Sequence, residues 1–318
     1  LFLPKEDVSQ RIYLTIKDQE KRADLLFKKV TFEEVSAGVK YWQLEAEVGS
    51  VNKSTGIATL QNASGTFFRK GKPVLRFRSP GALWDMKKKE IYLDKPLGYD
   101  VSLEHKIAGI ISRLKRSPVS VFNLPTKQQN SQPGYWFQAN NLSWKLADEQ
   151  IVCTGGILLN KGEVSGYAAR LQGDVGLDKV RLEGSPRIVM EIPGSAPVTI
   201  EAQAFEVLGP EDIFIAHGNP KVTWQEASII AQSARYLQAD KKLAMTGAVK
   251  INYRDINAEG SSADYLTVEQ KVILSGSAFA RQGDNQLTGE KVMVSLKDSK
   301  LSVLGRSRVV VSGEGRAP

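Results

Sequence analysis

The chain has 318 residues, of which 42% are hydrophobic, enough for one large domain or two of ordinary size. Its 43 lysines and arginines exceed its 35 aspartates and glutamates, and the resulting charge of +8 favours an anionic partner. A single cysteine excludes an intrachain disulfide framework and a multi-cysteine metal site. With only two histidines, His105 and His217, a histidine-based metal site or catalytic triad is not expected.

The N-terminal region is predicted to be a linker. No run of 18 apolar residues occurs, so no membrane-spanning helix is predicted within the sequence. Because the chain begins with Leu1 rather than methionine, we expect a signal or membrane anchor to precede it. Residues 1–28 would then connect that anchor to the folded part.

Most of the remaining sequence shows the alternation of half-buried β-strands. Leu44, Ala46 and Val48 are separated by polar residues, and Val292, Val294 and Leu296 repeat the pattern near the end. Polar or glycine-containing clusters such as 52–56 and 239–242 separate these runs and predict tight turns. The sequence therefore predicts many short antiparallel strands.

Residues 102–134 depart from this pattern and are predicted to be an insertion. Ile107, Ile110, Ile111 and Leu114 are spaced as one face of a short helix, with basic residues off that face. A polar, proline-containing loop follows. Two interpretations stay open: a basic amphipathic helix that touches a membrane surface or a partner, or a cap over the end of a β-core.

A repeat of 29 residues organises the sequence. Glycines stand 29, 34, 29, 29 and 29 residues apart, and the longer interval contains the insertion 193–197. A small residue lies 16 residues before each glycine, and two earlier units keep that spacing between Ala46 and Asn62 and between Ser79 and Lys95. The repeat glycines are Gly155, Gly184, Gly218, Gly247, Gly276 and Gly305.

Each unit is predicted to be a strand, a tight turn and a longer strand bent at the glycine. Apolar residues recur 5, 12 and 14 positions after the small residue, and Cys153 occupies one of these core positions. A unit of this size cannot bury its apolar face alone, so stacked units would share one interior. The predicted fold is all-β: an elongated, twisted β-jelly roll of stacked hairpin units with an open apolar interior and one short helical insertion.

The sequence resembles the OstA/LptA family of lipopolysaccharide-transport proteins. The resemblance is seen in the C-terminal unit, which contains Gly283 to Val292 and ends with Val303 to Val309. The start resembles the LptC branch, with Trp42 to Glu47 followed by Leu60 to Gly65. The predicted segments are LptC-like units over 29–101, further units over 135–192, LptA-like units over 198–312 and a flexible tail at 313–318.

The resemblance implies a non-enzymatic periplasmic protein, tethered to the inner membrane by the preceding helix. Such a protein receives lipopolysaccharide from an inner-membrane transporter complex and passes its acyl chains along an apolar groove toward the outer membrane. Other transport proteins of the same fold are the implied partners. The competing hypothesis is a structural β-repeat protein of the cell envelope with a closed core.

Ten large apolar side chains on the inward-facing positions are the candidate groove. The competing interpretation is that each of these side chains is simply part of the packed core. They are Phe77, Trp84, Phe137, Trp144, Ile200, Phe205, Phe214, Ile229, Tyr236 and Tyr265.

No catalytic residue, metal ligand or cofactor is predicted. Carboxylate pairs such as Glu33-Glu34 are adjacent on a strand, so they point to opposite faces and make no acid/base dyad. The aromatic side chains share the inward parity of the apolar columns, which argues against a nucleic-acid partner.

The last strand is predicted to be a free edge that pairs with a partner. It is β-branched and uninterrupted by proline, features that invite strand addition. The candidate edge residues are Leu301, Val303, Val309 and Val311.

Overall fold

The computed structural model describes residue 18, residues 23–116 and residues 134–311, with side chains of 113–116 excepted. The chain forms two compact units, here called unit 1 (residues 1–182) and unit 2 (residues 183–318). Most of the predicted linker, the loop after the helix and the tail at 313–318 lie outside the described residues. None of the helices described is long and apolar enough to cross a membrane.

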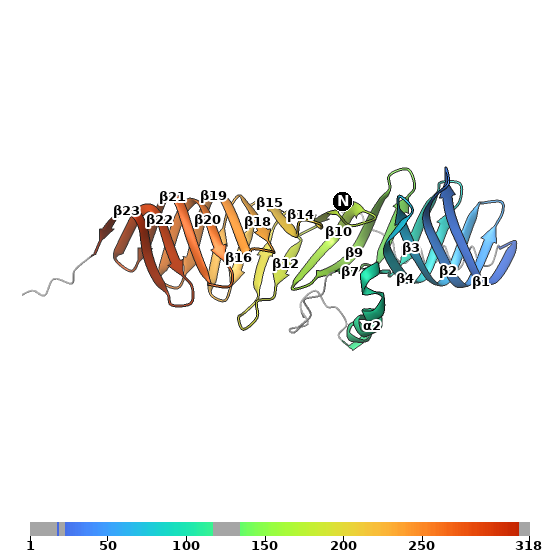
Figure 1. The fold of residues 1–318 in the computed structure, drawn as a ribbon, viewed down its shortest axis with the longest axis horizontal. Coiled ribbons are helices and arrows are strands. Elements are labelled where there is room, and N and C mark those ends of the chain that lie inside the picture. The colour runs from blue at the N-terminus through green and yellow to red at the C-terminus, as the bar shows by residue number, and fades with distance from the viewer. Residues whose placement is uncertain (1–17, 19–22, 117–133, 312–318) are drawn as a thin grey trace, which may run out of the picture. The chain divides into compact units, whose positions relative to one another are not determined.

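Over residues 23–116 and 134–182, unit 1 is built from antiparallel strands and one helical segment (Figure 1). Its first strand begins at Leu25, inside the predicted linker. The elements are β1 Leu25–Ser36, β2 Val39–Asn52, β3 Ile57–Arg69, β4 Lys72–Asp85, β5 Glu90–Asp94, β6 Leu97–Asp100, the 3₁₀ helix η1 Val101–Lys106, α2 Ile107–Arg116, β7 Tyr135–Gln138, β8 Asn141–Lys145, β9 Gln150–Lys161, β10 Val164–Asp174 and β11 Lys179–Glu183.

Over residues 183–311, unit 2 is built from strands and the turns between them. Short strands come first and are followed by five long ones that lie side by side in chain order (Figure 1). The strands are β12 Arg187–Met190, β13 Val198–Glu201, β14 Ala204–Leu208, β15 Ile213–His217, β16 Lys221–Trp224, β17 Ala227–Ile230, β18 Ser233–Leu237, β19 Lys242–Tyr253, β20 Ile256–Leu266, β21 Lys271–Gln282, β22 Asn285–Ser295 and β23 Lys300–Val310.

The long strands bend so that their two halves form two ladders. The first half of β19, Lys242–Thr246, pairs with β18. The second half pairs with β17, where Lys250 lies opposite Ile230. Buried side chains occur in both halves, for example Met245 and Ile251. The hairpins therefore enclose one apolar core between two faces, and the predicted all-β jelly-roll class is confirmed.

The repeat glycines mark the bends. All six have left-handed backbone, with φ between 76° and 85°. The β19–β20 register shifts between Thr246 and Val249, which flank Gly247. Asn62 and Lys95, the corresponding residues in the two earlier units, also have positive φ, 49° and 45°. The 29-residue spacing therefore corresponds to a bulge that turns each strand from one face to the other.

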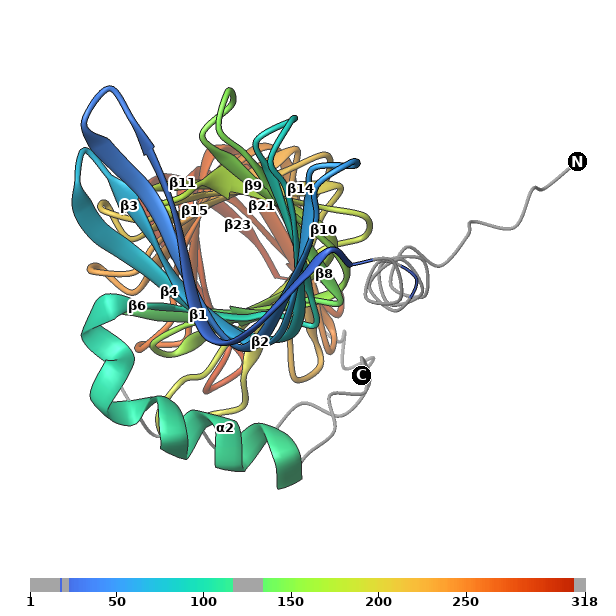
Figure 2. The same cartoon turned by 90° about the vertical axis from the view of Figure 1, so that its right-hand side faces the viewer.

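The helical segment packs against the outside of unit 1. Its start is capped by the Asp100 carboxylate, which accepts a hydrogen bond of 2.8 Å from the Ser102 backbone N–H. Leu103, Ile107 and Ile110 are buried, and η1 contacts β4 and β6. Figure 2 shows α2 outside the strands. The segment is therefore not a cap over the end of the core, because its apolar face covers an outer sheet face instead.

The 193–197 insertion is anchored within unit 2 by a serine. The Ser195 hydroxyl accepts hydrogen bonds from Trp224 Nε1 at 3.2 Å and from Gln270 Nε2 at 2.8 Å. The extra five residues therefore do not break the repeat. They form a loop whose hydroxyl satisfies two side-chain donors.

Candidate functional site

One apolar stripe crosses the first ladder of unit 2. Strand register places the residues of the +5 and +12 columns directly opposite one another, so β14, β15 and every strand from β18 to β23 contribute one side chain each. We call this stripe 1; its members are Val207, Phe214, Tyr236, Leu243, Tyr265, Val272, Val294 and Leu301.

A second stripe crosses the other ladder of unit 2. It too passes from strand to strand without a polar interruption. We call it stripe 2; its members are Ile188, Ile200, Val222, Ile229, Ile251, Ala258, Ala280, Leu287 and Val309. Both stripes end on β23, the last strand, so the apolar interior continues to the edge of the sheet.

In unit 1, phenylalanine rings lie over glycines of neighbouring strands. Phe77 is opposite Gly65 and Phe137 is opposite Gly98. A Cβ at Gly65 would lie 2.5 Å from Phe77 Cζ, so the ring occupies the space that a side chain would need. Each ring packs over the glycine on the neighbouring strand and fills that part of the interior. Strand register determines this arrangement, so it could not be predicted from the sequence.

Nine of the ten predicted groove residues are buried. Phe137 and Tyr265 are 0% exposed, and Trp84 alone is only half-buried. Trp84 contacts the Trp42 ring, with centroids 4.9 Å apart, and the Phe32 ring, with centroids 5.6 Å apart. The predicted inward orientation is therefore seen, but the interior at these positions is filled by protein side chains. An acyl chain could enter only if those side chains moved.

Three polar groups at predicted groove residues have no hydrogen-bond partner among the described residues. They are Trp84 Nε1, Trp144 Nε1 and the Tyr265 hydroxyl, all of them buried atoms. Burial raises the pKa of the Tyr265 hydroxyl, which keeps it a neutral donor. Burial likewise raises the pKa of Cys153, as expected of a core residue rather than a nucleophile. The interior therefore keeps unused donors within apolar surroundings.

Exposed apolar side chains gather on the first and last strands. On β1, Leu26 is 69% exposed, and Leu25 and Phe27 are also exposed. On the last strand, Val309 is 54% exposed and Val311, just beyond it, is 69% exposed, whereas the predicted edge residues Leu301 and Val303 are half-buried. β1 pairs with β2 and β23 pairs with β22, and each presents its other edge.

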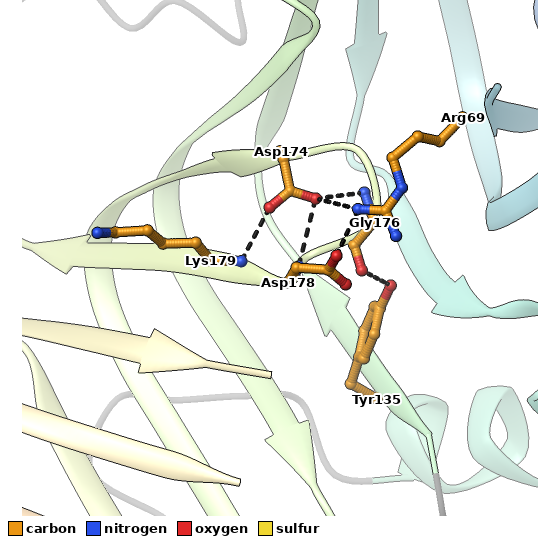
Figure 3. Close-up of polar contacts among 6 residues, drawn as sticks. All are labelled: Arg69, Tyr135, Asp174, Gly176, Asp178 and Lys179. Carbon is orange, nitrogen blue, oxygen red and sulfur yellow. Dashed lines mark hydrogen bonds and ion pairs between the residues drawn. The ribbon is translucent and has the colours of Figure 1, made fainter. Parts of the chain in front are cut away.

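A polar cluster ties the β3–β4 hairpin to the loop after β10 (Figure 3). Arg69 Nη1 lies 2.5 Å from Asp178 Oδ2 and 3.4 Å from Asp174 Oδ1. Asp174 also accepts backbone hydrogen bonds from Gly176, Asp178 and Lys179, and the Tyr135 hydroxyl donates to the Gly176 carbonyl at 2.7 Å. The hydrogen bond to Asp178 raises the pKa of Arg69 further, so the guanidinium stays charged.

The basic turn at 87–89 is engaged with its own chain. Lys88 lies 3.3 Å from Asp85, and Lys89 lies 2.9 Å from Glu34. Lys87 Nζ donates to the Ser54 carbonyl at 2.8 Å. Glu33 pairs separately with Lys40 at 2.6 Å, so the Glu33-Glu34 carboxylates have different partners, in line with their predicted opposite faces.

These features define a stack of antiparallel hairpins with a continuous apolar interior. Residues 199–300, which lie within unit 2, match the family described as LptA/(LptD N-terminal domain) LPS transport protein. The predicted resemblance to lipopolysaccharide-transport proteins is therefore confirmed for this part of the chain.

A solved structure also aligns with part of the chain. It is the crystal structure of LptH, the LptA-homologous periplasmic component of the conserved lipopolysaccharide transport device from Pseudomonas aeruginosa. The alignment covers 37% of this chain and 96% of LptH, at 15% identity and a TM-score of 0.34. No curated protein matches the chain.

Proposed function

We propose that this protein is a non-enzymatic periplasmic carrier of lipopolysaccharide. It receives the lipid from an inner-membrane transporter complex and passes it toward the outer membrane, with the acyl chains held in the jelly-roll interior. The observation that carries the proposal is the family match over residues 199–300, where stripe 1 and stripe 2 run unbroken to the last strand.

The physical chemistry of the interior suits a sliding lipid. Burial of an acyl chain contributes about 0.8 kcal/mol per methylene without directional bonds, so a chain can shift along an apolar stripe at little cost. The unpartnered donors Trp144 Nε1 and Tyr265 Oη would bind ester or amide oxygens near the start of such a chain.

The exposed edges support transfer between proteins of the same fold. A partner strand that pairs with β23 would cover Val309 and Val311 and extend both stripes across the joint. The exposed apolar side chains of β1, the first strand, offer a second edge for strand pairing with a partner. We further propose that a helix upstream of residue 1 tethers the protein to the inner membrane.

One observation favours a second candidate, a structural β-repeat protein with a closed core. The candidate groove residues Phe137, Trp144 and Phe205 are at most 1% exposed. A permanently closed interior of this kind would stabilise the fold without carrying a lipid. The two candidates differ in whether the interior ever contacts an acyl chain.

Site-specific photo-crosslinking in cells separates them. A photoreactive amino acid replaces Trp144 in unit 1 or Phe205 in unit 2, and adducts with lipopolysaccharide are measured after irradiation. Matched controls replace the neighbouring residues Lys145 and Glu206, whose side chains point to the opposite face of the same strands. The carrier predicts adducts from the interior positions at several times the yield of the outward ones. Equal or absent yields from every interior position would favour the closed core.

A further inference from the structure

A cleft lies on the outside of unit 1, between the sheet and the helical segment. Its volume is about 1020 Å³. The outer faces of β2, β3 and β4 form its floor, while Glu104 of η1 and Ile111 of α2 contribute one wall. Figure 2 shows the helix outside these strands. The groove candidate Phe77 also borders this cleft, but the charged side chains of Arg76 and Arg78 alternate with Phe77 along β4 and therefore lie on the outer face of the sheet.

The helical wall is held in place. Arg76 Nη1 on β4 lies 3.0 Å from Glu104 Oε2 on η1. Leu103 is 3% exposed and Ile107 is 2% exposed, so the apolar face of the segment is anchored on the sheet. A Cβ at Gly134 would lie 2.8 Å from Ser102 Oγ and 3.0 Å from Leu103 Cγ, so the returning chain packs tightly on η1. The cleft is therefore a formed feature of the fold.

The charge of the cleft favours an anion. Three cations line it, Arg76, Arg78 and Lys95, against two carboxylates, Glu45 and Glu104. Glu104 is paired with Arg76. Arg78 hydrogen-bonds the Tyr99 hydroxyl and Lys95 lies near Asp94, but neither cation forms an ion pair with a carboxylate among the described residues. Arg76 Nε is a buried donor without a hydrogen-bond partner there. Guanidinium and ammonium groups that face a cleft without an ion-pair partner are the groups that bind phosphate or carboxylate.

The remaining lining matches a hydroxyl-rich ligand. Amide and hydroxyl side chains surround the cations. A few apolar side chains offer a surface on which the face of a sugar ring can pack. The amide and hydroxyl side chains include those of Gln43, Asn62, Ser64, Thr66, Tyr99 and Gln138. The apolar lining includes Phe68, Pro73 and Ile111.

We propose that the outer cleft is a binding site for an anionic sugar, with its phosphate or carboxylate on Arg78 and Lys95. The inserted helical segment then has a function: it converts an outer sheet face into a walled site. The inference goes beyond lipid carriage in the interior, because nothing in the cleft requires an acyl chain.

Calorimetric titration of the intact protein tests this. The probes are glucose 6-phosphate, glucose as the neutral control, and lipopolysaccharide from which the acyl chains have been removed; the two anionic probes distinguish a free sugar phosphate from the sugar part of a lipid. We expect at least one anionic probe to bind, glucose to bind at least tenfold more weakly, and affinity to fall with added salt. Absence of binding by both anionic probes would overturn the proposal.

A double variant locates the site. Arg78→Gln with Lys95→Gln removes both cations proposed to hold the anion and should weaken anionic binding at least tenfold. The matched control, Arg235→Gln with Lys250→Gln, removes one arginine and one lysine from exposed strand positions of unit 2 and should leave affinity unchanged. Circular dichroism verifies that both variants are folded. Equal losses in the two double variants would show general charge attraction and contradict the assigned site.

Discussion

Left-handed backbone at the strand bends makes glycine the residue of lowest cost there. Gly155 has φ of 79°, and a Cβ at this position would lie 2.9 Å from Cβ of Asn140. Gly155→Ala should therefore lower the free energy of unfolding of unit 1 by about 1–2 kcal/mol, measured by urea denaturation. Gly109→Ala is the control, because α2 leaves open space at that position and alanine is the better helix former. Equal unfolding midpoints for the two variants would contradict the bulge assignment.

A buried carboxylate in unit 1 lowers stability at neutral pH. Asp94 is 7% exposed, and its Oδ1 atom has no hydrogen-bond partner among the described residues. Burial raises the pKa of Asp94, although nearby Lys95 opposes the shift. The folded protein therefore binds this proton more tightly than the unfolded chain, and the ionised form destabilises the fold above the folded pKa.

Asp94→Asn should consequently raise the stability of unit 1 at pH 7 by about 1 kcal/mol. The gain should shrink as the pH falls toward 3, where the carboxyl is protonated in both states. Thermal unfolding of parent and variant between pH 3 and 7 measures this. Asp148→Asn, at an exposed position of the same unit, should give no comparable gain. A gain that stays constant with pH would show that the ionised carboxylate is not the cause.

At the scale of single elements, the Arg69 cluster connects segments that are more than 100 positions apart in sequence. Arg69→Met keeps the aliphatic stem and removes the charge that Asp174 and Asp178 share. Because the Arg69 side chain is 38% exposed, the loss of global stability should stay below about 1 kcal/mol. Hydrogen exchange at the Gly176 and Lys179 amides should become faster, since both donate to Asp174.

Arg254→Met is the matched control for this experiment. Arg254 pairs with Glu226 in unit 2 at 2.9 Å and has no role in the Asp174 loop. Its replacement should leave exchange at Gly176 and Lys179 unchanged. Unaltered exchange in the Arg69 variant would mean that the loop holds its shape without the guanidinium.

Strand addition to β23 can be tested with proline. In an antiparallel pair, successive residues direct their N–H groups alternately toward the partner strand and away from it. Of Arg308→Pro and Val309→Pro, one removes a donor on the free edge and the other breaks the β22–β23 ladder. The edge-directed variant should keep the stability of unit 2 and lose crosslinking to its partner.

Two outcomes would contradict strand pairing at β23. If the variant that preserves stability still assembles as well as the parent, β23 is not the pairing edge. If both variants assemble and remain folded, strand addition at this end is wrong altogether.

Much of the repeat could be predicted from the sequence because it rests on local chemistry. The glycine spacing predicted the bends, which the structure shows to have left-handed backbone. The +5 and +12 columns lie opposite one another across the strands, as Tyr265 and Val272 show. The position of the helical segment was missed, since its apolar face fits an outer sheet face as well as a core end. The rings of Phe77 and Phe137 over glycines were also missed, because long-range register decides them.

At the scale of the molecule, the central question is whether the filled interior admits a lipid. Five tryptophans occur in the chain, and four of them, Trp42, Trp136, Trp144 and Trp224, are at most 5% exposed. Their fluorescence therefore reports on what enters the core. Bromine atoms quench tryptophan only at near contact, so lipopolysaccharide with brominated acyl chains distinguishes chains inside the interior from chains held outside it.

The decisive measurement compares tryptophan quenching by brominated and unbrominated lipopolysaccharide, with dissolved iodide as the control for solvent access. The account predicts strong quenching by the brominated lipid, none by the unbrominated lipid and little by iodide, because the rings are buried from water and would contact an acyl chain that enters the interior. Binding of the brominated lipid without any quenching would place its chains outside the core and contradict the proposed carrier.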